Sequence, residues 1–163
     1  MTTAKKPTIL LVDNDPEALD VLIDALREAG YDTEVATTGE RALHWAGLTA
    51  PDLILGEAEL PDLEKFGLVD AVAAAPHLGA IPVVFLAGLE GEENRLRGLR
   101  TGALDYIHKP VSSEEVVVRV GKYLEIIAAR RRLEETLAAL ERELAELRER
   151  LSKVQQIHAH ALI

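Results

Sequence analysis

The chain has 163 residues, of which 48% are hydrophobic and 28% charged, so it has the size of about one globular domain and is too short for a large multidomain enzyme. The absence of cysteine excludes disulfide scaffolds, cysteine metal centres and thiol catalysis and fits a reducing cytoplasm, while no apolar run approaches the roughly 20 residues of a membrane span. The net charge of −10 comes entirely from residues 1–113, which hold 9 basic and 19 acidic side chains, and this excess opposes binding to nucleic acid.

Five short apolar runs predict strands at residues 8–12, 33–36, 53–56, 82–87 and 104–107. Most of them are apolar on both faces, which is typical of parallel strands covered by helices on both sides. Helices are predicted from Pro16 to Gly30, over 42–47, over 68–75, over 92–101 and from Ser112 onward. This alternation, with right-handed crossovers, predicts an α/β fold with a doubly wound, five-stranded parallel sheet.

Three of the predicted helices have recognisable start signals. Asp15 can cap the helix that Pro16 opens, because proline at the first helical position wastes no backbone donor. Thr37 and Ser112 are each followed three residues later by glutamate, which is the spacing of a capping box.

The last part of the chain predicts one long helix, because residues 114–163 contain no proline and a single glycine. Apolar side chains recur there in alternating steps of three and four, which is the pattern of a heptad seam. The seam consists of Leu133, Leu137, Leu140, Leu144, Leu147, Leu151 and Val154. We therefore expect one domain over 1–125, followed by a coiled-coil helix over 126–163 that joins two copies of the chain.

The charges beside the seam are compatible with this dimer. Glu143 at a g position and Arg148 at the next e position have the spacing of an attractive pair in a parallel dimer. The seam is interrupted at Arg130, which takes an a position. The alternative is a single amphipathic helix folded back on the domain, but the apolar stripe is narrow for packing against a sheet.

Polar side chains follow three of the predicted strands. In a doubly wound sheet, strands one, three and five can be adjacent, and their carboxyl ends form one site. Carboxylate oxygens with a lysine counter-charge would suit Mg²⁺ and a phosphoryl group. Alternatively, the acids only cap helices, as Asp15 is placed to do. The candidate residues are Asp13, Asn14, Asp15, Glu57, Glu59 and Lys109.

Several segments, in order and spacing, resemble the receiver domain of two-component response regulators over residues 8 to about 125. They are VDNDP at 12–16, PDLIL at 51–55, ELP at 59–61, IPVVFLA at 81–87 and GALDYIHKP at 102–110. The resemblance implies a flavodoxin-like sheet. It also implies two acids that hold Mg²⁺ after the first strand, a phosphoacceptor aspartate after the third, a Thr or Ser after the fourth and a lysine after the fifth.

The chain departs from the family at three of these positions. Asp13 matches the first metal acid, but Asn14 replaces the second with a neutral amide. Glu57 stands at the phosphoacceptor position, and its extra methylene displaces the carboxylate by about an ångström, which can cost about 100-fold in rate. Ala87 stands where the family has a hydroxyl, and only Lys109 is unaltered. The family's metal site, to which Glu59 would add a carboxylate, is therefore expected to bind Mg²⁺ weakly or not at all.

Two expectations follow for the switch residues. The charge of Glu57 should lie near Lys109, roughly where a phosphoryl group's charge would lie, and this pair either mimics the active state or only stabilises the fold. Because Ala87 is small, we expect the Tyr106 ring to be turned inward without any signal. The alternative is a partly exposed surface tyrosine.

The resemblance and its departures lead to one main functional hypothesis. We expect a pseudo-receiver of two-component signalling or a phosphorelay that has no enzymatic activity and docks another signalling protein as a cytoplasmic homodimer. Neither nucleic acid nor a membrane is an expected partner. The alternatives are a phosphorylatable, Mg²⁺-dependent response regulator and the regulatory N-terminal part of a larger signalling enzyme, because the sequence ends at Ile163 within the helical pattern.

Overall fold

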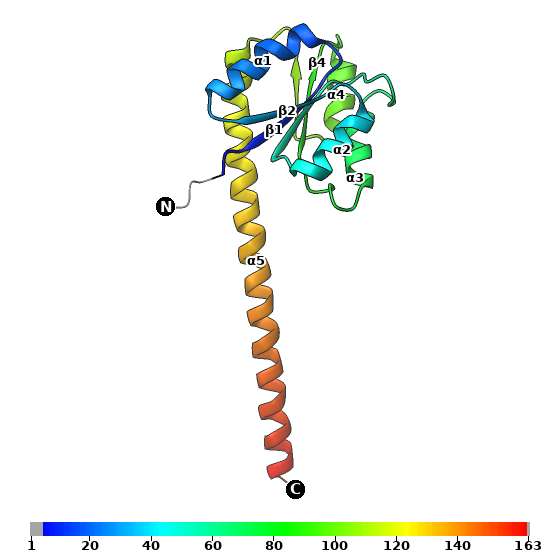
Figure 1. The fold of residues 1–163 in the computed structure, drawn as a ribbon. Helices are drawn as coiled ribbons and strands as arrows, with labels where there is room; N and C mark the ends of the chain where they lie inside the picture. Colours follow the sequence, from blue (N-terminus) through cyan, green and yellow to red (C-terminus); the bar gives the residue numbers. More distant parts are fainter. Residues whose placement is uncertain (1–4, 163) are drawn as a thin grey trace. The chain divides into compact units, whose positions relative to one another are not determined.

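In the computed structural model, which describes residues 5–162, five strands alternate with five helices. The strands are β1 (Thr8–Val12), β2 (Asp32–Ala36), β3 (Leu53–Gly56), β4 (Val83–Ala87) and β5 (Asp105–His108). The helices are α1 (Pro16–Glu28), α2 (Gly39–Thr49), α3 (Gly67–Ala74), α4 (Glu92–Arg100) and α5 (Ser113–Ala161). The predicted doubly wound, five-stranded parallel sheet is confirmed (Figure 1).

The strand order in the sheet is β2-β1-β3-β4-β5. The expectation that strands one, three and five are adjacent is therefore wrong in part. β1 and β3 are paired directly, with Val12 opposite Gly56, but β4 lies between β3 and β5. A residue that follows β5 must consequently reach past the end of β4 to meet residues that follow β1 and β3.

The sheet is buried on both faces. Successive residues of a strand point to opposite faces, so a run that is apolar throughout supplies two cores. One face carries Leu10, Val12, Ile54, Val83 and Phe85 and belongs to the same cluster as Ala42 and Ala46 of α2 and Leu68 and Val72 of α3. The opposite face carries Ile9, Leu11, Leu53, Leu55, Val84 and Leu86, all buried. Figure 1 shows α2, α3 and α4 on one side of the sheet and α1 on the other.

Helix starts are satisfied by side chains, with one departure from the sequence prediction. The carboxylate of Asp15 accepts from the Glu17 N–H at 3.2 Å, as predicted for the cap of α1. The predicted capping box at Thr37 is wrong, because the cap of α2 is Thr38, whose hydroxyl accepts from the Arg41 N–H at 3.1 Å. At α5, the Ser112 hydroxyl accepts from the Glu115 N–H at 3.1 Å.

A second group also holds the start of α2. The carboxylate of Asp62 accepts from the backbone N–H groups of Gly39 at 2.8 Å and Glu40 at 2.9 Å. Asp62 lies between β3 and α3, so it ties the segment after β3 to a helix more than twenty residues earlier in the chain. These two hydrogen bonds lower the pKa of the Asp62 carboxyl below its ordinary value.

The described residues divide into two compact units, one ending at Gly121 and the other beginning at Lys122. The second unit is helical, and it contains the whole predicted seam. In the single chain the seam side chains are between 47% exposed, at Leu144, and 71% exposed, at Leu133. Within residues 5–162 we find no helix whose length and apolar character would allow it to cross a membrane.

Candidate functional site

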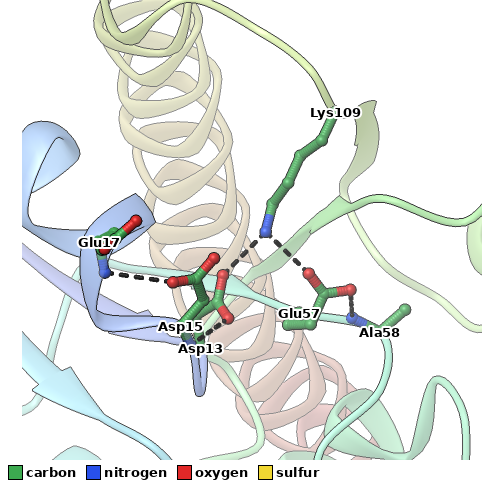
Figure 2. A network of polar contacts seen from close by, with 6 residues as sticks. All are labelled: Asp13, Asp15, Glu17, Glu57, Ala58 and Lys109. Carbon is green, nitrogen blue, oxygen red and sulfur yellow. Dashed lines mark hydrogen bonds and ion pairs between the residues drawn. The ribbon is translucent and has the colours of Figure 1, made fainter.

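The carboxyl ends of β1, β3 and β5 bring three charged side chains together. The Nζ atom of Lys109 lies 2.8 Å from Asp13 Oδ2 and 2.8 Å from Glu57 Oε2 (Figure 2). One ammonium group is thus shared between two carboxylates that come from neighbouring strands. Of the candidates named from the sequence, these three meet in one contact.

Backbone hydrogen bonds beyond the strand ends set the positions of these residues. The Glu57 N–H donates to the carbonyl of Val12 at 2.8 Å, which places Glu57 directly beside the end of β1. The Lys109 N–H donates to the carbonyl of Ala87 at 2.9 Å, so the backbone after β5 follows the end of β4. The long lysine side chain then reaches past β4 to the two carboxylates.

Each carboxylate has a second donor on its other oxygen. Glu57 Oε1 accepts from the N–H of Ala58 at 2.9 Å, and Asp13 Oδ1 accepts from the N–H of Asp15 at 3.0 Å (Figure 2). The Glu57 carboxylate is therefore held between an ammonium group and a backbone amide. Charge-assisted hydrogen bonds of this kind are the strong ones, and together they fix the orientation of the carboxylate.

The three side chains are largely withdrawn from solvent, with exposures of 24% for Lys109, 11% for Asp13 and 13% for Glu57. Burial lowers the pKa of Lys109, but its hydrogen bonds and charge attraction to the two carboxylates outweigh burial, so the pKa lies above the ordinary value for lysine. The ammonium form is thus stabilised, and the site is an ion-paired group held in place by backbone amides.

The remaining candidate metal ligands do not join this group. Asn14 and Glu59 are exposed, and Asp15 caps α1. Within residues 5–162, no three acidic or histidine side chains are arranged to hold a metal ion. Mg²⁺ prefers several oxygen ligands in octahedral geometry, whereas here Asp13 engages both of its oxygens with protein donors. The donor set therefore does not fit a strong Mg²⁺ site.

Ala87 and Tyr106 lie in the core cluster that also contains Phe66 and Phe85. Ala87 is fully buried at the end of β4. The ring of Tyr106 is only 7% exposed, which is the inward orientation expected from the sequence, and its hydroxyl donates to the carbonyl of Leu89 at 3.2 Å. Burial, and secondarily the charge of Glu57, raise the pKa of the Tyr106 hydroxyl.

Gly98 of α4 makes room for this ring. A Cβ atom at Gly98 would lie 2.7 Å from Cδ2 of Tyr106 and 3.1 Å from the ring of Phe66. The two rings are themselves in contact, with centroids 6.3 Å apart. The inward position of Tyr106 therefore depends on the missing side chain at Gly98.

The free space next to the ion-paired group is small. A cavity of about 30 Å³ lies between the group and α1, and it is lined by Asp13, Glu57 and Lys109 together with Ala18, Leu19 and Leu22. Such a volume holds about one water molecule and is far below the size of a nucleotide or cofactor pocket. The site can therefore hold charged groups in place, but this cavity is too small to bind a large substrate.

Sequence reasoning missed the backbone partners of the site. The Ala58 N–H and the Leu89 carbonyl carry no sequence signal, because every residue except proline offers the same groups. Gly98 did give a signal, since a glycine inside a helix costs about 1 kcal/mol relative to alanine and indicates a packing requirement.

The comparisons with known proteins agree with this geometry. The family model of the response regulator receiver domain matches residues 9–121. The transcriptional regulatory protein BaeR of Escherichia coli is 36% identical over 129 residues, which are 79% of this chain and 52% of that protein. The chain spans about half the length of BaeR and of the Synechocystis regulator RpaA, of which it covers 47%.

Two solved structures are similar in fold and sequence. A CheY-like receiver domain protein of Methanospirillum hungatei has a TM-score of 0.69 and 28% identity, with 77% of this chain and 99% of that chain covered. A response regulator of Desulfuromonas acetoxidans has a TM-score of 0.69 and 30% identity, with 74% of this chain and 98% of that chain covered.

Proposed function

The chain belongs to the response regulator receiver family of two-component signalling, and we propose that it is a member that works without phosphorylation, as a homodimeric docking module for another signalling protein. One observation carries the proposal. The Glu57 carboxylate accepts hydrogen bonds from both the Lys109 ammonium group and the Ala58 amide at the strand end.

A phosphoryl group bound at this strand end would need these same donors. The Glu57 carboxylate already binds both donors, the Lys109 ammonium group and the Ala58 amide, so these groups have their anion without a phosphoryl group. Attack on a phosphoryl donor would require the carboxylate to leave Lys109 and to take up in-line geometry from a side chain one methylene longer than aspartate. Misplacement by about an ångström is enough to suppress such a transfer by about 100-fold.

The lack of a hydroxyl at Ala87 and the buried ring of Tyr106 support the same proposal. In the family, the hydroxyl residue of the fourth strand moves toward the phosphate and the aromatic residue of the fifth strand turns inward. Here the ring is already inward, with its hydroxyl bonded to Leu89. We infer that the surface formed by α4 and β5 keeps one shape and docks a partner protein in that shape.

The homodimer rests on the exposed heptad seam of α5. Apolar side chains that repeat in steps of three and four along a helix are buried when two such helices pair. The curated relatives include transcriptional regulators, but the excess of negative charge in residues 1–113 favours a protein partner over nucleic acid.

The experiment is incubation of the full chain with acetyl phosphate and Mg²⁺, followed by intact mass spectrometry. We expect no added phosphoryl mass on the wild-type chain, because Glu57 remains bound to Lys109. The matched variant N14D/E57D/A87T restores the family residues at the three altered positions and should gain the phosphoryl mass. A receiver with the unaltered family residues serves as the positive control.

A phosphoryl adduct on the wild-type chain would overturn the proposal. That result would favour the second candidate, a phosphorylatable response regulator. This candidate is supported by the buried Asp13 and by Lys109, which is the family's residue at its position. A third candidate is a regulatory part of a longer signalling protein, favoured by the length of the curated relatives beyond the matched region.

A further inference from the structure

We propose that α5 pairs with α5 of a second copy in the antiparallel sense, with the two-fold axis between Ala145 and Glu146. The inference deepens the proposed function, since it rests on the homodimer and assigns its orientation. It is carried by the charges on both sides of the seam.

The seam is a surface that needs a partner. Seven apolar side chains, from Leu133 to Val154, form one continuous stripe along the helix and are 47–71% exposed in the single chain. Contiguous apolar surface of this extent marks an interaction site in a folded protein. A second copy is the occupant, because its own α5 offers a stripe of the same length and period.

The buried side chains alone do not choose the orientation. In a parallel dimer each seam residue faces its own copy, so that Leu144 meets Leu144 of the partner. In an antiparallel dimer centred at 145.5, Leu144 meets Leu147 of the partner and Leu137 meets Val154 of the partner. Six of the seven seam side chains meet one another in both orientations, and only Leu133 differs, since it meets Leu133 of the partner in the parallel dimer and His158 of the partner in the antiparallel one. The flanking charges distinguish the orientations more sharply.

These charges are segregated along the helix. Before the centre, the e and g positions carry Glu141 and Glu143, and after it they carry Arg148 and Arg150. No ion pair within 4.0 Å joins any of the four to another described residue of the same chain, although Lys153 and Glu149, away from the seam, do pair at 3.2 Å. The four groups are therefore available for contacts between chains.

Antiparallel pairing satisfies all four charges. Glu143 then faces Arg150 of the partner, and Glu141 faces Arg148 of the partner; with two-fold symmetry, each pair occurs twice. A parallel dimer pairs only Glu143 with Arg148 of the partner and leaves Glu141 opposite Thr136 of the partner. The antiparallel orientation thus has four attractive pairs and the parallel orientation two.

The charges also select this antiparallel register. A shift by one heptad toward the N-terminus would place Glu141 and Glu143 each opposite its own copy. A shift by one heptad toward the C-terminus would do the same to Arg148 and Arg150. Like charges at facing positions are destabilising, so of these three registers only the one centred at 145.5 avoids repulsion.

The orientation sets the distance between the two ends of the dimer. Lys122, the first residue of the helical unit, lies about 23 residues from the centre, or about 35 Å of helix at 1.5 Å per residue. The two Lys122 residues would be about 70 Å apart in the antiparallel dimer, but only about 10 Å apart in a parallel one. An antiparallel dimer would therefore bridge two separate partners.

Cysteine cross-linking tests the orientation cleanly, because the chain contains no cysteine. The full-length variants L137C and V154C are oxidised separately and as a mixture, with one of them carrying a mass tag. We expect a disulfide only in the mixture, between Cys introduced at Leu137 of one chain and at Val154 of the other. A disulfide in L137C alone would establish parallel pairing and overturn the inference.

Light scattering on the wild-type chain separates the two possible failures. A dimer that gives neither disulfide would show that the copies associate elsewhere, which refutes the antiparallel seam while the proposed homodimer stands. A monomer would refute the homodimer as well.

A charge variant gives an independent measurement. R150E replaces attraction to Glu143 of the partner by repulsion in the antiparallel dimer, whereas in a parallel dimer position 150 faces the neutral Gln155 of the partner. We expect the dimer dissociation constant to rise about tenfold or more. R142E changes the net charge equally but lies on the outer face, and it should have little effect. E143R/R150E should restore the affinity; an R150E dimer as tight as wild type would contradict the inference.

Discussion

At the scale of single residues, Lys109 and Gly98 hold two parts of the site in place, the ion-paired group and the ring of Tyr106. Lys109 holds the carboxylates of Asp13 and Glu57, each at 2.8 Å. Gly98 leaves the space that the ring of Tyr106 fills. Burial and, to a smaller extent, the charge of Glu57 raise the pKa of the Tyr106 hydroxyl.

The first prediction concerns Gly98→Ala. The new methyl group would overlap the rings of Tyr106 and Phe66, so we expect a destabilisation of about 1–3 kcal/mol despite the higher helix propensity of alanine. If the ring is forced outward, the pKa of Tyr106 falls toward the ordinary value of about 10. Urea unfolding and an NMR titration of labelled tyrosine measure the two effects.

Gly121→Ala is the matched control for this prediction. Gly121 also lies in a helix, but its added Cβ would meet only the hydroxyl oxygen of Tyr31, at 3.6 Å, an ordinary contact. It should leave stability unchanged or improve it. An equally stable Gly98→Ala variant with an unshifted Tyr106 pKa would show that the ring does not depend on this space.

At the scale of elements, the segment after β3 and the start of α2 are joined by Asp62. Its ionised carboxylate accepts two backbone N–H groups at the positive end of the α2 dipole, a position that favours negative charge. The segment from Glu57 to α3 is thereby anchored to the start of α2. The contact helps to keep the β3–α3 connection in one conformation.

The second prediction is the pH dependence of this anchor. The pKa of Asp62 is lower in the folded chain than in the unfolded chain. Its contribution to stability is therefore present above the unfolded value of about 3.9 and is lost as pH falls through the folded value. The stability difference between wild type and Asp62→Ala, measured by urea unfolding, should be full at neutral pH and shrink below about pH 4.

A difference that stays constant over this pH range would mean that Asp62 does not act through its charge. Asp52 is not a suitable control, because its carboxylate accepts from the Thr8 N–H at 2.8 Å. Asp20, an exposed residue of α1, is better, and Asp20→Ala should show no comparable change between neutral and acid pH.

The elements themselves were largely predictable from the sequence, because apolar runs and cap residues are local signals. The helix cap at Asp15 and all five strands follow from residues within a few positions of each other. The strand order and the cap of α2 did not follow. The strand order and the second anchor of α2, at Asp62, depend on residues far apart in the chain, and such contacts leave no local pattern. The cap itself is local, but the sequence offers two adjacent threonines, and the structure uses Thr38 rather than Thr37.

The residues of the candidate site likewise fall into those that the sequence predicts and those that only the folded chain shows. Asp13, Glu57 and Lys109 could be named because each directly follows a strand whose carboxyl end was expected to form the site. Glu59 could not be excluded from the sequence, yet it lies two residues beyond Glu57 and is exposed. The amide of Ala58 leaves no sequence signal, and although a glycine inside a helix indicates a packing requirement, only the folded backbone shows that Tyr106 fills the space at Gly98.

At the scale of the whole molecule, the proposed output of this receiver is the assembly of two copies and the docking of a partner protein. In the proposed function, the ion-paired site at the carboxyl ends of the strands would keep its carboxylates bound to Lys109, and the seam of α5 would supply the contact between copies. Regulation would then come from the amount of protein and from its partners, since the site holds no exchangeable phosphoryl group in this proposal.

The most direct measurement is the NMR spectrum of the full-length chain before and after addition of Mg²⁺ and beryllofluoride, which imitates a phosphoryl group on an acceptor carboxylate. The backbone amide signals of Ala58 and Tyr106 report the acceptor position and the switch ring. We expect both signals to stay in place at saturating reagent, while those of N14D/E57D/A87T move. Saturable shifts of these two signals in the wild-type chain would contradict the account.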